Sequence, residues 1–125
     1  MKRFAVAAFA AILGTGPAAA HHSGTMFDKS REITLQGTVK EFQYTNPHSW
    51  IQLLVQNEVG GEVEWSVETA APIVLLRAGI RRTSLQPGES VTVRVHPMVD
   101  GAAGAELIDV TKDDGTVLSL RPAGG

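Results

Sequence analysis

The stretch that sets the expected fold is residues 63–79, with the sequence VEWSVETAAPIVLLRAG. Up to Val67 apolar and polar side chains alternate, a period of two that is typical of a strand with one buried face. From Pro72 the residues are almost all apolar until Gly79. Because proline near the start and glycine past the end mark a helix, we predict a short helix within residues 71–78. Thr69 is available as its cap, and its apolar composition suggests a plug for one end of a sheet or barrel.

Two further alternating runs precede this stretch. The first extends from Ile33 to Tyr44, and its apolar phase shifts after Val39, downstream of the strand glycine Gly37, which suggests a β-bulge. The second covers residues 51–55 and leads to a glycine turn at residues 60–61. Together with residues 63–67, these runs predict a three-strand meander.

The chain after the helix predicts two or three more strands. Residues 91–95 alternate valine with polar side chains, and residues 107–111 and 117–120 are two shorter runs. Three strands, a helix and then two strands is the element order of an OB-fold, a small partly open Greek-key barrel. We therefore predict a mainly β fold, a small OB-like antiparallel β-barrel of five to six strands with one short helix between the third and fourth strands.

This fold predicts both the core and the binding face. In an OB-fold, ligands bind to the face of the second and third strands, bordered by the loops after the first and fourth strands. Here those loops carry His48 and His96, and His96 points away from the valine face of its strand. The side chains predicted to face the core are Ile51, Leu53, Val55, Val63, Trp65, Val67, Val91, Val93 and Val95.

The first 20 residues follow the pattern of a secretory signal peptide. They contain basic Lys2 and Arg3, an apolar run over residues 4–13 and a small-residue end at residues 18–20. The apolar run is too short for a transmembrane helix, which needs roughly 20 residues. We therefore expect cleavage after Ala20 and a periplasmic mature protein without a transmembrane span.

The predicted mature chain is one small acidic domain. Removing 20 of the 125 residues would leave 105, which we divide into an extended lead-in over 21–31, a single β-barrel domain over 32–121 and a loose tail over 122–125. Without Lys2 and Arg3, nine basic and 13 acidic residues remain, a formal net charge of −4. This charge argues against nucleic acid as a partner. The chain has no cysteine, so any metal would be held by imidazole, carboxylate, thioether or the terminal amine.

A set of short motifs is spread along the chain. They are Ala20-His21-His22-Ser23, Phe27-Asp28, Gly37-Thr38-Val39, Asn46-Pro47-His48-Ser49, Trp65-Ser66-Val67-Glu68, Leu85-Gln86-Pro87-Gly88, His96-Pro97 and Asp100-Gly101. Together they resemble an uncharacterised family of exported bacterial proteins, domain of unknown function 6152. The resemblance covers nearly all of the mature chain. It implies export and a single small domain, and it implies no activity or catalytic residue.

The histidines predict a transition-metal site, with copper as the first candidate. All four lie at the predicted mature N-terminus or in the two loops: His21, His22, His48 and His96. Imidazole is a ligand for copper, zinc, nickel and iron. Cleavage after Ala20 would give His21 a free amine beside its ring, a chelate that with a further histidine resembles the histidine brace of copper monooxygenases. Cleavage one residue earlier would place a histidine third, the spacing of amino-terminal copper(II) and nickel(II) sites.

Topology predicts which histidines meet. In an OB-type barrel the fourth strand runs antiparallel to the first, so His96 should approach the lead-in. We therefore predict a primary cluster of His21, His22 and His96, because this path orders few residues. His48 is then an independent rim residue or a weaker fourth ligand. The ten residues from His21 to Ser30 extend up to roughly 35 Å, however, which is enough to reach His48 instead.

Other residues of the two loops are further candidates. Asn46, Trp50 and Met98 are the predicted ligand contacts, and the thioethers of Met98 and Met26 favour copper(I). Glu68 is a candidate ligand at the helix start. The structural alternatives are a solvated His-His tail, histidines that stabilise proline turns, aromatic residues that belong to the sheet and core, and glutamates that form a solvated strand face.

Three hypotheses for function remain open. The leading one is a binding domain without catalytic residues that holds copper, another transition metal or a small ligand. The second is a copper oxidoreductase with a brace at His21. The third is a metal-independent interaction module for an envelope protein, with Trp50 as its anchor. The chain contains no nucleophile-elbow, zincin or phosphate-loop motif.

Overall fold

The structure is a computed structural model in which residues 26–121 are described. The predicted signal peptide, the predicted ligands His21 and His22, and the predicted tail at residues 122–125 lie outside the described residues.

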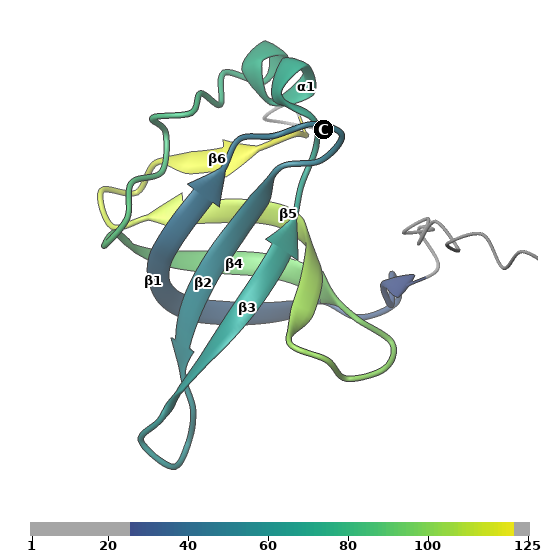
Figure 1. The fold of residues 1–125 in the computed structure, drawn as a ribbon, viewed down its shortest axis with the longest axis vertical. Helices are drawn as coiled ribbons and strands as arrows, with labels where there is room; N and C mark the ends of the chain where they lie inside the picture. Colours follow the sequence, from purple (N-terminus) through teal and green to yellow (C-terminus); the bar gives the residue numbers. More distant parts are fainter. Residues whose placement is uncertain (1–25, 122–125) are drawn as a thin grey trace, which may run out of the picture.

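The described chain forms a closed five-strand barrel with one additional strand (Figure 1). Its elements are β1 (Ile33–Gln43), β2 (Trp50–Gln56), β3 (Glu62–Glu68), α1 (Pro72–Arg77), β4 (Ser90–Pro97), β5 (Gly104–Lys112) and β6 (Val117–Ser119). The sheet order is β3-β2-β1-β4-β5-β6, and a parallel pairing of β3 with β5 closes the barrel. The predicted OB-like barrel, with its short helix between the third and fourth strands, is confirmed.

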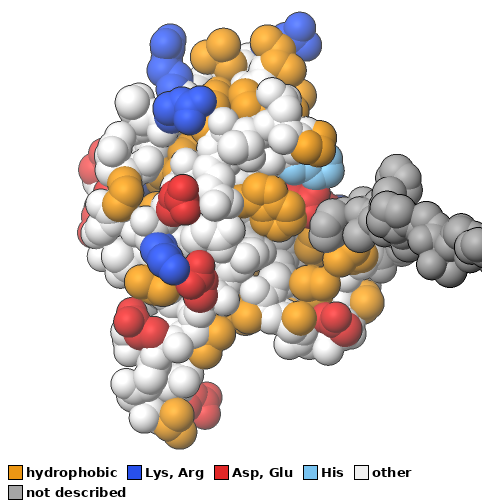
Figure 2. Space-filling view, viewed as in Figure 1, with side chains coloured by type: hydrophobic (Ala, Val, Ile, Leu, Met, Phe, Trp, Pro, Cys, Tyr) orange, Lys and Arg blue, Asp and Glu red, His pale blue; other side chains and the backbone are white. Residues whose placement is uncertain are grey.

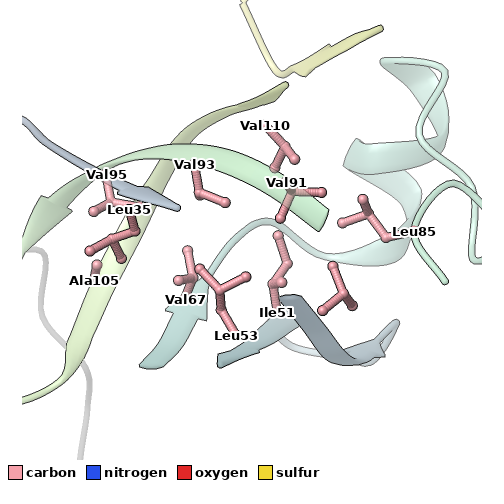
Figure 3. Packing of buried hydrophobic residues seen from close by; sticks show 11 residues of the cluster. Leu35, Ile51, Leu53, Val67, Leu85, Val91, Val93, Val95, Ala105 and Val110 are labelled. Carbon is pink, nitrogen blue, oxygen red and sulfur yellow. The ribbon is translucent and has the colours of Figure 1, made fainter. Parts of the chain in front are cut away.

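The core is filled by apolar side chains from all five barrel strands, which point toward one another between the strands (Figure 3). Of the nine side chains predicted to face inward, six are buried, and Val55 and Trp65 pack against the buried cluster. Val63 is 36% exposed, so its prediction is wrong. It pairs with Val55 near the tip of the β2–β3 hairpin, which projects beyond the barrel body (Figure 1). Apolar and polar residues alternate there as in any strand, but no core side chains lie opposite the face that carries Val63.

The predicted irregularity of the first strand is also present. The register of β1 against β2 shifts between Val39 and Glu41. Gly37 is needed for a different reason, since a Cβ at this position would lie 2.5 Å from the carbonyl oxygen of Leu54. This close backbone approach explains a glycine inside a strand.

The helix differs from its prediction in its cap and in its packing. Ala71, not Thr69, is the N-cap residue, and no side chain caps the helix. Only Leu75 of α1 is buried, because the six-residue helix is less than two turns long and turns one side chain inward. The helix therefore inserts fewer side chains into the end of the barrel than predicted. Among residues 26–121, no helix is long and apolar enough to span a bilayer.

Strand β5 starts earlier than the predicted residue 107. Gly104–Glu106 pair with Ser66–Glu68 of β3 and carry little apolar periodicity of their own. Backbone pairing across the barrel closure, rather than side-chain pattern, makes this segment a strand.

The turn before β4 is held by Glu89. Its carboxylate accepts a hydrogen bond from the Gln86 amide at 2.5 Å and lies 3.0 Å from the Lys112 ammonium. These two interactions hold the pKa of Glu89 below its usual value, with the backbone hydrogen bond as the larger cause.

Candidate functional site

The loop between β1 and β2 is fixed to the segment that follows β3. The Ser49 amide donates to the Ala70 carbonyl at 3.1 Å, and the Thr69 amide donates back to the Ser49 carbonyl at 2.9 Å. Ser49 is completely buried. The loop contains a cis Asn46–Pro47 peptide bond. His48, between this peptide and Ser49, therefore projects from a well-anchored backbone.

His48 is hydrogen-bonded to Glu68, the last residue of β3. The contact joins His48 Nδ1 to Glu68 Oε1. An ionised carboxylate only accepts hydrogen bonds, so Nδ1 is the donor in this pair. The Glu68 side chain is 8% exposed, whereas that of His48 is 45% exposed. The arrangement is thus a half-exposed imidazole whose inner nitrogen is held by a buried carboxylate.

The second oxygen of this carboxylate, Glu68 Oε2, is buried and has no hydrogen-bond partner among the described residues. A buried acceptor without a partner typically destabilises a fold by about 1–3 kcal/mol. The exposed glutamates Glu62 and Glu64 on the same strand carry no such cost. If only the stability of the fold mattered, a glutamate would therefore be unfavourable at position 68.

A small apolar cavity lies beside this pair. It has a volume of about 150 Å³ and includes Glu68, Trp50 and Ser66 on the outer face of β2 and β3. Trp50 stands directly opposite Glu68 in the β2–β3 pairing. Figure 2 shows a histidine and an acidic side chain at the surface next to hydrophobic ones. The remaining lining comes from Met26, Phe27, Met98 and residues 102–105.

The Met98 thioether depends on a glycine for its position. A Cβ at Gly104 would lie 2.6 Å from Met98 Sδ, too close for any real contact. Met98 is also bridged to Phe27 of the lead-in, and the Val99 amide donates to the Met26 carbonyl at 2.9 Å. The cavity therefore brings both predicted thioethers to the face of β2 and β3.

His96 has a different environment. It is 9% exposed and lies under the lead-in, where its Nδ1 is 2.8 Å from the Arg31 carbonyl oxygen. A carbonyl oxygen accepts, so Nδ1 is again the donor. His96 meets the lead-in as the topology predicts, but this contact satisfies a backbone carbonyl.

Several predicted site residues come together and others do not. Trp50 and Met98 line one cavity, and His48 reaches it through Glu68. Asn46 is exposed in the turn. Within residues 26–121, no group of three or more histidine, aspartate or glutamate side chains is placed to hold a metal ion. The predicted cluster of His21, His22 and His96 stays a prediction, because two of its members lie outside the described residues.

The burial of Glu68 is the feature that sequence reasoning underestimated. Glu62, Glu64 and Glu68 alternate regularly with apolar residues, which indicates one solvated face. Only the end of β3 is covered, because the β1–β2 loop and the segment at residues 98–105 approach it. The sequence feature that could have indicated this burial is the position of Glu68 at the end of its strand, directly before the helix.

Residues 10–106 match the model of a family of unknown function (DUF6152). No curated protein and no solved structure showed a significant match to the chain.

Proposed function

This chain belongs to DUF6152, a family of unknown function, and we propose that it is a non-catalytic binding protein of the periplasm that holds copper at His48. The observation that carries the proposal is the hydrogen bond between His48 and the buried Glu68. Histidines that bind metals usually donate their other ring N–H to a carboxylate or a carbonyl. Glu68 thereby fixes the ring and leaves Nε2 of the half-exposed His48 as the ligand atom.

The neighbouring thioethers support copper over zinc. Met98 and Met26 line the cavity that Glu68 also lines. Thioether sulfur is a soft ligand that selects copper(I), whereas carboxylate and water suit harder ions. His48 with one or two thioethers would form an incomplete set, so the proposal needs a further donor.

The predicted mature N-terminus is our candidate for that donor. His21 and His22 precede Met26 by five and four residues, and five extended residues reach at most about 18 Å. Met26 itself lines the cavity. An N-terminal amine and imidazole would therefore be tethered near His48. In this proposal His48 is the main copper ligand, and His96 is a structural residue.

Equilibrium dialysis of the processed protein tests the proposal. We expect micromolar or tighter binding of copper(I) or copper(II), with zinc(II) weaker. Dissociation constants no better than millimolar for copper and zinc alike would overturn the metal site. Intact mass of periplasmic material tests the compartment, because a chain that retains residues 1–20 has no free amine at His21.

A second candidate function rests on the apolar lining of the cavity. Phe27, Trp50 and the alanines at residues 102, 103 and 105 would suit an apolar side chain of an envelope protein partner. Such binding would be insensitive to a chelator. Capture of a partner that survives chelation and is lost in Trp50→Ala would favour this function over copper binding.

A further inference from the structure

The end of the barrel that carries α1 forms a surface that shares no residue with the lining of the cavity beside Glu68. We define the α1 end as residues 72–82 together with residues 117–121, which are β6 and the two residues that follow it. The two segments face each other across an open groove of about 1010 Å³. None of the residues that line the cavity beside Glu68 also lines this groove.

Exposed aliphatic side chains are concentrated there. Eight large hydrophobic side chains are exposed among the described residues, and five of them lie at the α1 end. They are Ile73, Val74, Leu76, Val117 and Leu120. Single exposed aliphatic residues are ordinary, but a group of them around one short helix marks a contact surface.

The same end is basic in an otherwise acidic chain. No acidic residue occurs from Thr69 to Gly88, a stretch that includes Arg77, Arg81 and Arg82. Arg121 adds a fourth cation at the edge of the groove. Figure 2 shows blue and orange side chains together at the top of the molecule, where α1 lies in Figure 1.

Three of these arginines have no internal counter-charge. The guanidinium groups of Arg77, Arg81 and Arg121 form no ion pair with any side chain of residues 26–121. Arg82 lies 5.3 Å from the centroid of the Tyr44 ring, a cation–π contact. By contrast, Arg94 is paired with Asp109 and Glu32. The α1 end therefore presents free positive charge beside apolar surface.

We infer that the α1 end docks on the surface of an anionic lipid bilayer. Interfacial binding needs aliphatic side chains that enter the headgroup boundary and cations that meet anionic lipids. Ile73, Val74 and Leu76 are exposed on α1, Arg77 is the last residue of this helix, and Arg81 and Arg82 follow it closely in the chain. An acidic, apolar protein segment is the other chemistry that this surface could accept. The membrane fits better, because Ile73 and Leu76 are exposed on α1 outside the groove, where a segment bound in the groove would not cover them.

Co-sedimentation of the processed protein with lipid vesicles tests this inference. We expect binding to vesicles of phosphatidylcholine mixed with phosphatidylglycerol and little binding to phosphatidylcholine alone, with the difference shrinking as salt is added. Each arginine near an anionic surface strengthens binding by about fivefold. The double variant Arg77→Gln/Arg81→Gln should therefore bind roughly 25-fold more weakly.

A second variant tests the aliphatic contribution against a matched control. Ile73→Ser/Leu76→Ser should weaken vesicle binding, whereas Val59→Ser should not, because Val59 is 90% exposed in the distant β2–β3 turn. Ile73 and Leu76 are about half exposed and Val59 is 90% exposed, so the unfolding midpoints should remain close to that of the parent protein. Equal binding to neutral and anionic vesicles, no binding to either, or full binding by both double variants would overturn the inference. Absence of vesicle binding would leave an acidic protein segment as the alternative.

Discussion

Replacing Glu68 by methionine separates a role in binding from a role in stability. The substitution removes a buried oxygen that has no partner among the described residues and keeps a side chain of similar length. Removing such an unsatisfied acceptor should increase the free energy of unfolding by about 1–3 kcal/mol. The lost hydrogen bond to His48 has a charged acceptor and is worth about 1.5–3 kcal/mol, but the desolvation cost of the ionised carboxylate is removed at the same time, and the half-exposed imidazole can bond to water instead. The metal-free variant should therefore be about 0–2 kcal/mol more stable than the parent protein.

Thermal unfolding in the presence of a chelator measures this change. For a domain of this size, 1 kcal/mol shifts the midpoint by roughly 4–8 °C, so we expect a rise between zero and about 15 °C. Glu62→Met is the matched control, because Glu62 is exposed on the same face of β3 and its replacement should change the midpoint little. A clear fall in the Glu68→Met midpoint would show that this carboxylate holds the fold together, and the reasoning would be refuted.

Three further predictions concern the core, the cavity and pH. Val93→Ala removes two methyl groups from a completely buried position and should cost about 2–3 kcal/mol in urea unfolding. Val117→Ala, at a 57% exposed position, should cost less than about 0.5 kcal/mol, and equal losses would contradict the assigned core. Gly104→Ala should displace the Met98 thioether and weaken copper(I) binding more than zinc(II) binding, so unchanged copper affinity would exclude that ligand. The pKa of Glu89 is lowered by hydrogen bonds from a backbone amide and a lysine, so its stabilising effect is present above its usual value of 4.5 and is lost as pH falls below that value. Glu89→Gln should therefore reduce the loss of stability below about pH 4.5, and parallel pH profiles for the two proteins would exclude this role.

Most of the fold could be predicted because local patterns and global topology agree. Alternation in β2 and β4, the Pro72 and Gly79 boundaries and the element order together specify an OB-like barrel. The exceptions arise where tertiary contacts decide the outcome. Val63 alternates correctly but lies beyond the core, and β5 begins at Gly104 because of backbone pairing across the barrel closure.

The site was less predictable than the fold. Topology places His96 beside the lead-in, but only the structure shows that its ring is bonded to the Arg31 carbonyl. The alternation of β3 makes Glu68 look solvated, since burial by two distant loops leaves no trace in the local pattern. The pairing of Glu68 with His48 joins residues 20 positions apart and could not be read from spacing.

The copper affinity of His48→Ala, compared with that of His96→Gln, tests the central claim most directly. Both proteins should start at His21 and be titrated with copper in parallel with the parent protein. The glutamine keeps a side-chain donor that can serve the Arg31 carbonyl, so His96→Gln should stay folded. We predict that His48→Ala binds copper at least tenfold more weakly and that His96→Gln binds as the parent does. Unchanged affinity in His48→Ala, or a larger loss in His96→Gln, would contradict a copper site at His48.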